Sequence, residues 1–331
     1  MSIKFEFCDF YSPTVEREWR ELYENDSHAT PLLSYDFNKS FLKYYYSNKV
    51  RKGTKPVLIK GSDEKSGKTL MFIPACRGES GYYMLWDYSA VPYCDVLLAD
   101  GKWDAEKYDS ELYKLASLLE NKVFNFTRMN NSSPYTEHLH CKYVPSKNNT
   151  CIRFDLLSSY NMFYKLMSKD MREYLSASAD KLLSEGHTFK TAVYYDQPIG
   201  KKTQKDLFKL HHGSSLSVFG VIQNKFRDKR NAITELINEG ADVLTAISYI
   251  DGAPAAFVSG VVRNGIMTVV RSGVNHLGYL YSAEYLNLCD LIKYSIERKR
   301  LTCIDFGRDN DAGKLEMGGK EHQMYSFEIN F

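Results

Sequence analysis

The stretch that decides the fold runs from residue 243 to residue 273 and reads VLTAISYI-DG-APAAFVSGVVR-NG-IMTVVRSG. Its apolar segments are separated by the dipeptides Asp251-Gly252 and Asn264-Gly265. Both dipeptides accept the positive φ angles that the two central positions of a type I′ turn require. The flanking segments are rich in β-branched residues, which favour strands. The stretch therefore predicts three antiparallel strands joined by two tight turns.

The segment after this meander is expected to pass from strand into helix. IMTVVRSG continues through VNHLGYL into a predicted helix from about Ser282 to Lys299, and the strands LTCIDFG and MYSFEI complete this half. The first amides of a helix have no partner inside it and the helix dipole favours negative charge there, so such a start is able to bind an anion. An ordinary strand-to-helix connection has the same pattern, and the residues alone leave both interpretations open.

The segment before the meander is expected to begin the same half. CIRFDL is a predicted strand that leads into one long helix from about Tyr160 to Ser184, and Gly186 suits a left-handed helix cap. The alternating run FKTAVYY predicts a further strand. Two more helices are expected near residues 204–214 and 225–238.

The first half of the chain runs through strands, hairpin and helix in a similar order. Its expected elements are the strand IKFEF, helices near residues 15–23 and 35–47, a hairpin of residues 56–60 and 69–75, the strand GYYMLW, a helix near residues 106–121 and the strand KVFNFTRM. The polar run PSKNNT, residues 145–150, lies between two strongly patterned regions. We therefore expect two lobes, residues 1–149 and residues 150–331.

Composition and charge limit the classes to which the protein can belong. The chain has 331 residues, 44% of them apolar, which is enough for two domains with buried cores. Lys and Arg number 43 and Asp and Glu number 41, so the net charge gives no reason to expect binding to DNA. No run approaches the ~20 apolar residues that span a bilayer, and the amino terminus lacks the pattern of a signal peptide. The 7 cysteines are scattered and never form CxxC, which is typical of reduced thiols, and we expect a cytoplasmic protein.

One glycine-rich stretch imitates a nucleotide-binding motif. GSDEKSGKT, from Gly61 to Thr69, resembles a phosphate-binding P-loop but places five residues between its glycines, where the motif needs four. An apolar strand follows it directly, whereas a P-loop leads into a helix. We interpret the stretch as the charged loop of a β-hairpin.

Two groups of histidines are candidate metal ligands. Adjacent residues on a helix diverge by about 100°, so His211 and His212 do not readily share one ion. His138, His140 and Cys141 have no fourth ligand at a recognisable distance. GSSLS, in turn, lacks the GxSxG elbow of serine hydrolases. We expect no metal cofactor and no serine-hydrolase chemistry.

Several motifs resemble one acyltransferase family. A meander, a helix that starts at a strand end and a further strand form the core of the GNAT acetyltransferase fold, and the details resemble its CelD/BcsL-type branch, which is related to FemABX-type transferases. The helix MSKDMREYLSASADKLLSEG resembles the family's basic helix closed by glycine. The other motifs are the hairpin residues Asp251, Gly252, Pro254 and Ala256, the strand residues Asp305, Phe306 and Gly307 followed by Lys314 and Gly318, and the segments PLLSYDF and PYCDVLL. The chain departs from the family pattern at Gly313 and Met317, where aromatic residues are expected.

The resemblance implies a fold class and a reaction. The fold is expected to be α/β (α+β), with two GNAT-like lobes, each a mixed, mostly antiparallel sheet flanked by helices, and with the active site in a cleft at or near the lobe interface. The carboxy-terminal lobe is expected to bind the donor, acetyl-CoA or another acyl-CoA, and the amino-terminal lobe the acceptor. The acyl group would pass to an amine or hydroxyl of a small molecule or of a nucleotide-linked or lipid-linked sugar in surface polysaccharide biosynthesis.

The candidate site residues follow from this resemblance and from the chemistry of acyl transfer, which needs a base, an oxyanion stabiliser and a proton for the leaving thiolate. The catalytic candidates are Lys314 for the oxyanion, His276 as base, Tyr279 or Tyr281 as acid, and Asp305. The candidate donor-binding residues are Val270, Arg271, Ser272 and Gly273 along the strand and Ser282, Ala283 and Glu284 at the helix start. The candidate acceptor-binding residues are Tyr88, Tyr93, Asp95, Arg172 and Tyr279.

Two other functions stay open at this point. FemABX-type transferases, which use aminoacyl-tRNA, resemble the same fold and the same lysine-containing signature, but the sequence shows no long charged helical hairpin of the kind that they often carry for tRNA. A non-catalytic two-lobed protein that binds a sugar or a partner enzyme is the second alternative, and the departures at Gly313 and Met317 support it. The residues do not set the oligomeric state.

Overall fold

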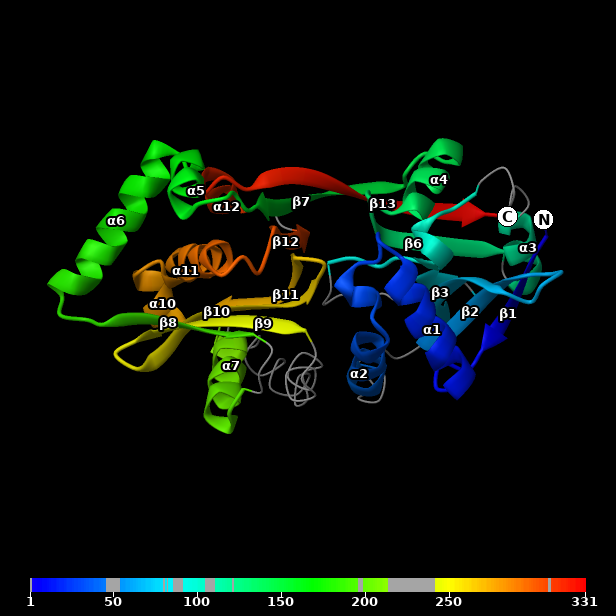
Figure 1. The fold of residues 1–331 in the computed structure, drawn as a ribbon, viewed down its shortest axis with the longest axis horizontal. Coiled ribbons are helices and arrows are strands. Elements are labelled where there is room, and N and C mark those ends of the chain that lie inside the picture. Colours follow the sequence, from blue (N-terminus) through cyan, green and yellow to red (C-terminus); the bar gives the residue numbers. More distant parts are fainter. Residues whose placement is uncertain are drawn as a thin grey trace. The chain divides into compact units, whose positions relative to one another are not determined.

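Figure 1 shows the fold of the chain as a computed structural model, which describes residues 2–45, 54–79, 81, 83–85, 92–104, 111–120, 122–195, 199–213, 242–308 and 311–331. The chain divides into two compact units. Unit 1 contains Met1–Thr150 and Gln323–Phe331, and unit 2 contains Cys151–His322. The last strand of the chain therefore contributes to unit 1. The roles expected for the lobes 1–149 and 150–331, acceptor side and donor side, stay predictions.

Unit 1 is built on a mixed sheet. Its strands are β1 (Ile3–Cys8), β2 (Thr54–Asp63), β3 (Thr69–Gly78), β4 (Tyr83–Leu85), β5 (Leu97–Leu98), β6 (Val123–Asn130) and the greater part of β13 (Lys320–Asn330). Their order is β1-β2-β3-β4-β6-β13, with β5 paired to β3. The helical elements are α1 (Pro13–Asn25), η1 (Pro31–Leu33), α2 (Tyr35–Tyr45), η2 (Ala99–Gly101), α3 (Glu111–Leu118) and α4 (Pro134–Lys142). Alternate residues of β6, Phe124 and Phe126, are fully buried with Leu115 of α3 in one core cluster, because they point to the same face of the strand.

Residues 64–68 of unit 1 connect the two strands of a β-hairpin. β2 and β3 pair antiparallel on either side of them. The Asp63 carboxylate accepts the amide hydrogen bonds of Lys65 and Ser66, each at 2.8 Å, and Gly67 supplies a φ of 70°. A strand and not a helix follows, so the interpretation of GSDEKSGKT as a hairpin loop is confirmed.

Unit 2 contains a second mixed sheet. Its strands are β7 (Lys147–Asp155, in this unit from Cys151), β8 (Phe189–Tyr195), β9 (Val243–Ile250), β10 (Ala253–Arg263), β11 (Ile266–Val274) and β12 (Cys303–Arg308), in the order β7-β12-β11-β10-β9-β8. The helices are α5 (Tyr160–Leu166), α6 (Lys169–Ser184), α7 (Lys201–Gly213), α10 (His276–Leu280), α11 (Ala283–Glu297) and α12 (Ala312–Glu316). Figure 1 shows α11 and α7 on opposite faces of β10 and β11. Both faces of β10 are therefore covered, and its residues from Ala255 to Val262 are buried.

The three-stranded meander at the centre of unit 2 is confirmed. β9 pairs antiparallel with β10, and β10 pairs antiparallel with β11. Asp251 and Gly252 have φ values of 49° and 75°, and Asn264 and Gly265 have φ values of 49° and 76°. These are the positive φ angles that a type I′ turn needs at both central positions.

The long helix expected over residues 160–184 is in fact two helices. α5 ends at Leu166 and α6 begins at Lys169. Between them Ser168 occupies the N-cap position of α6, and its Oγ accepts the amide hydrogen bond of Met171 at 3.0 Å. The prediction of one continuous helix is wrong because a serine inside the pattern caps a new helix.

The polar run of residues 145–150 belongs largely to a strand. β7 begins at Lys147, and the amide of Ser146 donates to the carbonyl of Ser326 at 2.8 Å. Backbone groups that find such partners form a strand in spite of polar side chains. The helix expected near residues 225–238 lies outside the described residues.

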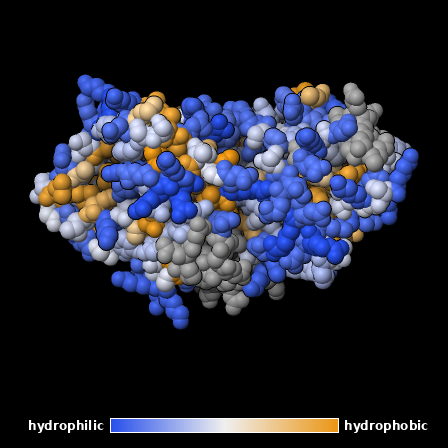
Figure 2. Space-filling view, in the orientation of Figure 1, coloured by the Kyte–Doolittle hydropathy of each residue, from blue (hydrophilic) through white to orange (hydrophobic). Residues whose placement is uncertain are grey.

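None of the described helices is long and apolar enough to cross a membrane. Figure 2 shows hydrophilic side chains over most of the face that it draws, with apolar side chains interspersed. In unit 2 the exposed apolar residues include Met162, Leu166 and Leu183.

Candidate functional site

Strands β11 and β12 of unit 2 pair over a short length and then separate. Their parallel pairing joins Ile266–Thr268 to Cys303–Asp305, whereas β11 continues beside β10 as far as Val274. The register of β10 and β11 shifts between Ser259 and Gly260, which marks a β-bulge. Bulges bend a strand and are frequent beside functional sites. The separation leaves space beside the carboxyl end of β11.

A cavity of about 190 Å³ occupies this space within unit 2. Its walls come from β10, β11 and β12, from the first turns of α11 and from the segment of α12. The lining residues are Phe257, Val258, Ser272, Gly273, Val274, Glu284, Tyr285, Leu288, Phe306, Asp311 and Lys314. We call it the unit 2 cavity. It brings together four of the sequence-predicted residues, namely Ser272, Gly273, Glu284 and Lys314.

Lys314 is held in place at this cavity. Its Nζ donates to Asp311 Oδ2 at 2.8 Å and lies 4.9 Å from the centre of the Phe306 ring. The lysine side chain is only 17% exposed. An ammonium that is shielded from water interacts more strongly with a nearby anion than a solvated one does. This position suits the oxyanion role expected of Lys314, which stays a prediction.

Asp311 links three groups of the cavity wall. Its Oδ1 accepts hydrogen bonds from the Tyr285 hydroxyl at 3.0 Å and from the Gly313 amide at 2.9 Å. Burial acts to raise the pKa of Asp311, but the hydrogen bonds from Lys314 and Tyr285 outweigh it and the pKa is lowered. Burial and the neighbouring Asp311 charge raise the pKa of Tyr285. Asp311 is therefore ionised and orients both Lys314 and Tyr285.

Glu284 is the second acid of the cavity. Its carboxylate accepts a hydrogen bond from its own amide, and Oε2 is buried without a hydrogen-bond partner among the residues that the structure describes. Burial and then the Asp311 charge raise the pKa of Glu284, while Lys314 acts in the opposite direction. A carboxylate in the first turn of a helix offsets the positive end of its dipole. The phosphate expected at the amides of Ser282, Ala283 and Glu284 stays a prediction, and this carboxylate opposes it.

Hydroxyl groups of α6 hold the start of α11 in place. Ser282 has a φ of 54°, which is uncommon for a residue other than glycine. Its Oγ lies 2.5 Å from the Tyr174 hydroxyl and accepts a hydrogen bond from Ser178 at 3.2 Å. The predicted donor-binding residues that do not line the cavity are Val270, Arg271, Ser282 and Ala283.

The candidates from the β11–α11 junction do not line the cavity either. His276 is exposed at the first position of α10, and Tyr279 is 66% exposed. Tyr281 is buried, and its hydroxyl donates to the Glu185 carboxylate. That hydrogen bond, together with burial, raises the pKa of Tyr281 and makes it a weaker acid. The expected roles of these three residues remain untested.

Asp305 and Arg172 are engaged with neighbouring backbone. Asp305 Oδ1 accepts the Gly307 amide hydrogen bond at 2.7 Å. Successive strand residues point to opposite faces, and because Phe306 lines the cavity, Asp305 faces away from it. Arg172, on α6, donates from Nη1 to the Met167 carbonyl at 2.7 Å. Their predicted catalytic and acceptor-binding roles rest on the family resemblance alone.

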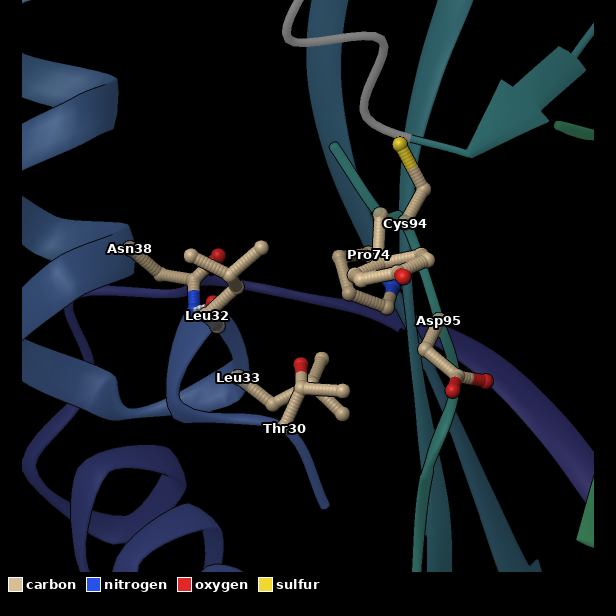
Figure 3. Close-up of a pocket in the computed structure, with 8 residues that line it drawn as sticks. Thr30, Leu32, Leu33, Asn38, Pro74, Cys94 and Asp95 are labelled. Atoms are coloured by element: carbon tan, nitrogen blue, oxygen red, sulfur yellow. Dashed lines mark hydrogen bonds between the residues drawn. The ribbon is translucent and has the colours of Figure 1, made fainter. Parts of the chain in front are cut away.

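Two predicted acceptor-binding residues, Tyr93 and Asp95, line a small pocket in unit 1. Figure 3 shows Thr30, Leu32, Leu33 and Asn38 on one side of it and Pro74, Cys94 and Asp95 on the other. Its volume is about 10 Å³, which is room for about one water molecule. Tyr88 lies outside the described residues. The pocket as it stands is too small for a sugar.

Asp95 is the titratable group of this pocket. It is 4% exposed, and its Oδ1 accepts hydrogen bonds from the Val96 amide and the Ser133 hydroxyl, each at 2.8 Å. Burial, with a smaller contribution from the charge of Asp26, raises the pKa of Asp95 to about 7 in spite of these hydrogen bonds. Asp95 is therefore partly protonated near neutral pH. Its expected contact with the acceptor stays a prediction.

Sequence reasoning missed Asp311 and Tyr285. The spacing of Asp311 and Lys314 was an available signal, because an aspartate at a helix start caps the helix and residues three apart on a helix meet. Tyr285 carries no comparable signal, since the chain has 25 tyrosines and nothing in the local pattern distinguishes this one.

Solved structures with a similar fold extend over nearly the whole chain. A tandem GNAT protein from the clavulanic acid biosynthesis pathway has a TM-score of 0.51 and 9% identity, covering 98% of each chain. FemX has a TM-score of 0.55 and 8% identity over 99% of this chain and 97% of its own. The carboxy-terminal domain of a protein assigned as a lysylphosphatidylglycerol synthetase of Agrobacterium fabrum has a TM-score of 0.55 and 12% identity, covering 96% of this chain and 91% of that domain.

Identities this low establish a shared fold alone. No protein-family model matches the sequence, and no curated protein matches it. The expected CelD/BcsL-type branch therefore stays a prediction. The chain has the mixed α/β fold of tandem GNAT proteins, with two sheets that are each flanked by helices.

Proposed function

We propose that this chain is an acyltransferase that moves an acyl group from acyl-CoA, with acetyl-CoA as the first candidate, to an amine or hydroxyl acceptor. The observation that carries the proposal is the unit 2 cavity, where a shielded, ion-paired Lys314 lies beside strands that separate. The two-unit GNAT fold supports it as well. The acceptor proposed from the family resemblance is a nucleotide-linked or lipid-linked sugar of surface polysaccharide biosynthesis, bound by unit 1.

The donor is proposed to lie along β11. The described residues of β12 pair with β11 no further than Thr268 and Asp305, so β12 leaves β11 before Ser272 and Gly273. An extended ligand with amide groups is able to pair with a strand edge as an added strand does. The pantetheine arm of coenzyme A has this chemistry. It would bring the thioester to Ser272 and Gly273, which line the unit 2 cavity.

Residues of the same cavity are suited to the chemical steps. Attack on the thioester carbonyl produces a tetrahedral oxyanion, which the Lys314 ammonium would stabilise. The departing thiolate takes up a proton, and the Tyr285 hydroxyl lies in the cavity as a weak acid, because burial and Asp311 raise its pKa. Asp311 orients both groups through its ion pair with Lys314 and its hydrogen bond from Tyr285.

Aminoacyl transfer from aminoacyl-tRNA is the second candidate. It is favoured by the similarity of fold to FemX over 99% of this chain, and by the lysine-containing segment that resembles FemABX-type transferases. The acyl-CoA donor is preferred because the described residues contain no long charged helical hairpin of the kind that these enzymes often carry for tRNA.

Thermal unfolding in the presence of each donor separates the candidates. A ligand that binds only the folded state at 100 times its Kd stabilises that state by about 2.7 kcal/mol. Acetyl-CoA is expected to raise the Tm, and aminoacyl-tRNA is not. A rise with aminoacyl-tRNA alone would favour the FemABX-type reaction, and no rise with either would favour a non-catalytic binding protein. Incubating the protein with labelled acetyl-CoA and a metabolite extract, followed by mass spectrometry, identifies the acceptor.

A further inference from the structure

Helix α10 presents three exposed side chains on its outer face. His276 is exposed, Tyr279 is 66% exposed and Leu280 is 49% exposed. Residues three and four apart lie on one side of a helix, so these three side chains face the same way. Leu277 and Tyr281, which are four apart as well, pack in or against a core cluster on the other side. α10 therefore has a buried side and an outer side that carries two rings and an aliphatic chain.

α10 is held firmly against strand β10. The Asn275 side chain caps the helix, because its Oδ1 accepts the Gly278 amide hydrogen bond at 2.8 Å while its Nδ2 donates to the Pro254 carbonyl at 2.7 Å. The Asn275 amide donates to the Ala255 carbonyl at 3.0 Å. Gly278 lies so close to β10 that a Cβ built on it would be 2.3 Å from the Ala255 oxygen. The backbone that carries the outer side chains is thus fixed before any ligand binds, which lowers the entropy cost of binding.

The outer rings of α10 are not used in packing between aromatic residues. Among the residues that the structure describes, neither the His276 ring nor the Tyr279 ring has another ring against it, whereas the Tyr281 ring packs on His187 with 5.3 Å between centroids. An exposed tyrosine is by itself ordinary on a protein surface. A tyrosine ring with a free face on a fixed support is, however, able to stack with a flat aromatic ligand.

The position of α10 relates it to the donor proposed above. β12 pairs with β11 at Ile266–Thr268 and closes that end of the strand. Ser272, Gly273 and Val274 line the unit 2 cavity, and Val274 is the last residue of β11. α10 begins two residues later, at His276. An extended ligand that lies along β11 with its reactive end in the cavity therefore leaves past Val274 and reaches α10.

Adenine is the part of coenzyme A that matches this surface. The pantetheine arm is a flexible chain of methylene and amide groups, and the phosphates have no aromatic face, so neither part stacks on a ring. A sugar ring of the acceptor also packs against aromatic side chains, but the acceptor is proposed to bind in unit 1. Replacing an aromatic side chain by alanine weakens the binding of a base stacked on it by roughly 5- to 150-fold.

We propose that Tyr279, with His276 and Leu280 beside it, binds the adenine ring of the coenzyme A donor. This proposal rests on the acyl-CoA donor proposed above. The pantetheine arm would lie along β11, and the nucleotide would extend beyond Val274 to the outer face of α10. Adenine would stack on the Tyr279 ring, and Leu280 would add an apolar contact. This assignment differs from the roles of base and acid expected of His276 and Tyr279, because neither residue lines the unit 2 cavity.

A matched pair of ligands tests the proposal. Coenzyme A and phosphopantetheine share the thiol, the amide chain and one phosphate, and only coenzyme A carries the adenosine. Isothermal titration calorimetry is expected to show that Tyr279→Ala weakens the binding of coenzyme A by about tenfold or more and leaves the Kd of phosphopantetheine unchanged. Tyr279→Phe keeps the ring and should bind both ligands as the wild type does. Tyr113→Ala removes a tyrosine that is 77% exposed on α3 of unit 1 and should change neither Kd.

An unchanged Kd of coenzyme A in Tyr279→Ala would overturn the proposal, and so would an equal loss for the two ligands. A loss in Tyr279→Phe as large as in Tyr279→Ala would overturn it as well, because the effect would then belong to the hydroxyl and not to the ring. Thermal unfolding without ligand checks the fold of each variant, and the exposed position of Tyr279 predicts an unchanged Tm. Coenzyme A binding that is equal in all variants would refute the Tyr279 assignment alone, whereas a wild type that binds no coenzyme A would refute the acyl-CoA function together with it.

Discussion

Lys314 Nζ lies 2.8 Å from Asp311 Oδ2, so Asp311 holds the ammonium group of Lys314 in the unit 2 cavity. The same ammonium lies 4.9 Å from the ring centre of Phe306, on the strand before the helix. Two neighbours from two elements thus fix one charged group where β11 and β12 have separated.

Replacement of Lys314 by alanine tests its role in the reaction. If the ammonium stabilises the oxyanion, Lys314→Ala should lower kcat/KM by about 10² or more, roughly 2.7 kcal/mol. Lys320→Ala is the control, because Lys320 pairs with Asp155 at 2.9 Å and its side chain is 65% exposed. Substrate turnover by Lys314→Ala at the wild-type rate would show that the active site does not lie in this cavity.

The ion pair of Asp311 should appear in the pH dependence of stability. The pKa of Asp311 is lowered in the folded state, so its ionised form contributes stability above the unfolded pKa, and that contribution is lost as the pH falls through the folded value. Asp311→Asn should therefore lower the Tm at pH 7, and the gap to the wild type should close below pH 3.8, the ordinary value. Thermal unfolding monitored by circular dichroism measures both. A gap that stays constant with pH would mean that the pair contributes nothing.

The contribution of Glu284 to stability should change with pH in the opposite sense. Burial raises the pKa of Glu284 in the folded state, so ionising it costs stability, and this cost appears as the pH rises from the ordinary value of 4.5 through the folded pKa. Glu284→Gln is therefore expected to raise the Tm at pH 7 and to match the wild type near pH 4. A lower Tm at pH 7 would show that Glu284 already has a stabilising partner. A group that costs stability while it faces a cavity is typical of a functional site.

In unit 1, the raised pKa of Asp95 predicts that the stability of the protein changes as the pH approaches neutrality. Its pKa is raised to about 7, so the wild type should lose stability as the pH rises from about 4 to about 7, where the folded carboxyl ionises. Asp95→Asn keeps the oxygen that accepts from Val96 and Ser133 and has no such ionisation. The difference in Tm between the variant and the wild type should grow across this range. A difference that does not change with pH would place the pKa of Asp95 near its ordinary value.

Gly278 should tolerate no larger residue. A Cβ built at this glycine would lie 2.3 Å from the backbone oxygen of Ala255. Gly278→Ala is expected to reduce the free energy of unfolding by about 1–3 kcal/mol, because the backbone of β10 would have to shift. Gly200→Ala is the matched control in the same unit, since no atom lies within 4 Å of its built Cβ. Equal urea midpoints for the two variants would contradict the close packing of α10 on β10.

The parts of the fold that short-range chemistry determines were predictable. Asp251-Gly252 and Asn264-Gly265 specify their turns through φ alone, so the meander follows from the residues of the turns and their flanks. The break before α6 was missed because Ser168 lies within a periodic helical pattern, and only its hydrogen bond to Met171 shows that it caps a new helix.

Long-range pairing was not predictable in the same way. β13 pairs with β6 about 200 residues earlier in the chain, for example Phe327 with Phe126, and no feature of MYSFEI indicates that partner. The unit 2 cavity has the same origin, because it depends on where β12 leaves β11. Lys314 was found through the family resemblance, and its spacing from Asp311 was a signal for that aspartate. Tyr285 became visible only once the fold brought α12 and α11 together.

A structure of the protein with bound coenzyme A tests the central claim most directly. The account predicts the pantetheine arm along Val270–Gly273 and the thiol in the unit 2 cavity near Lys314. Coenzyme A bound in unit 1, or in unit 2 away from β11, would contradict the account.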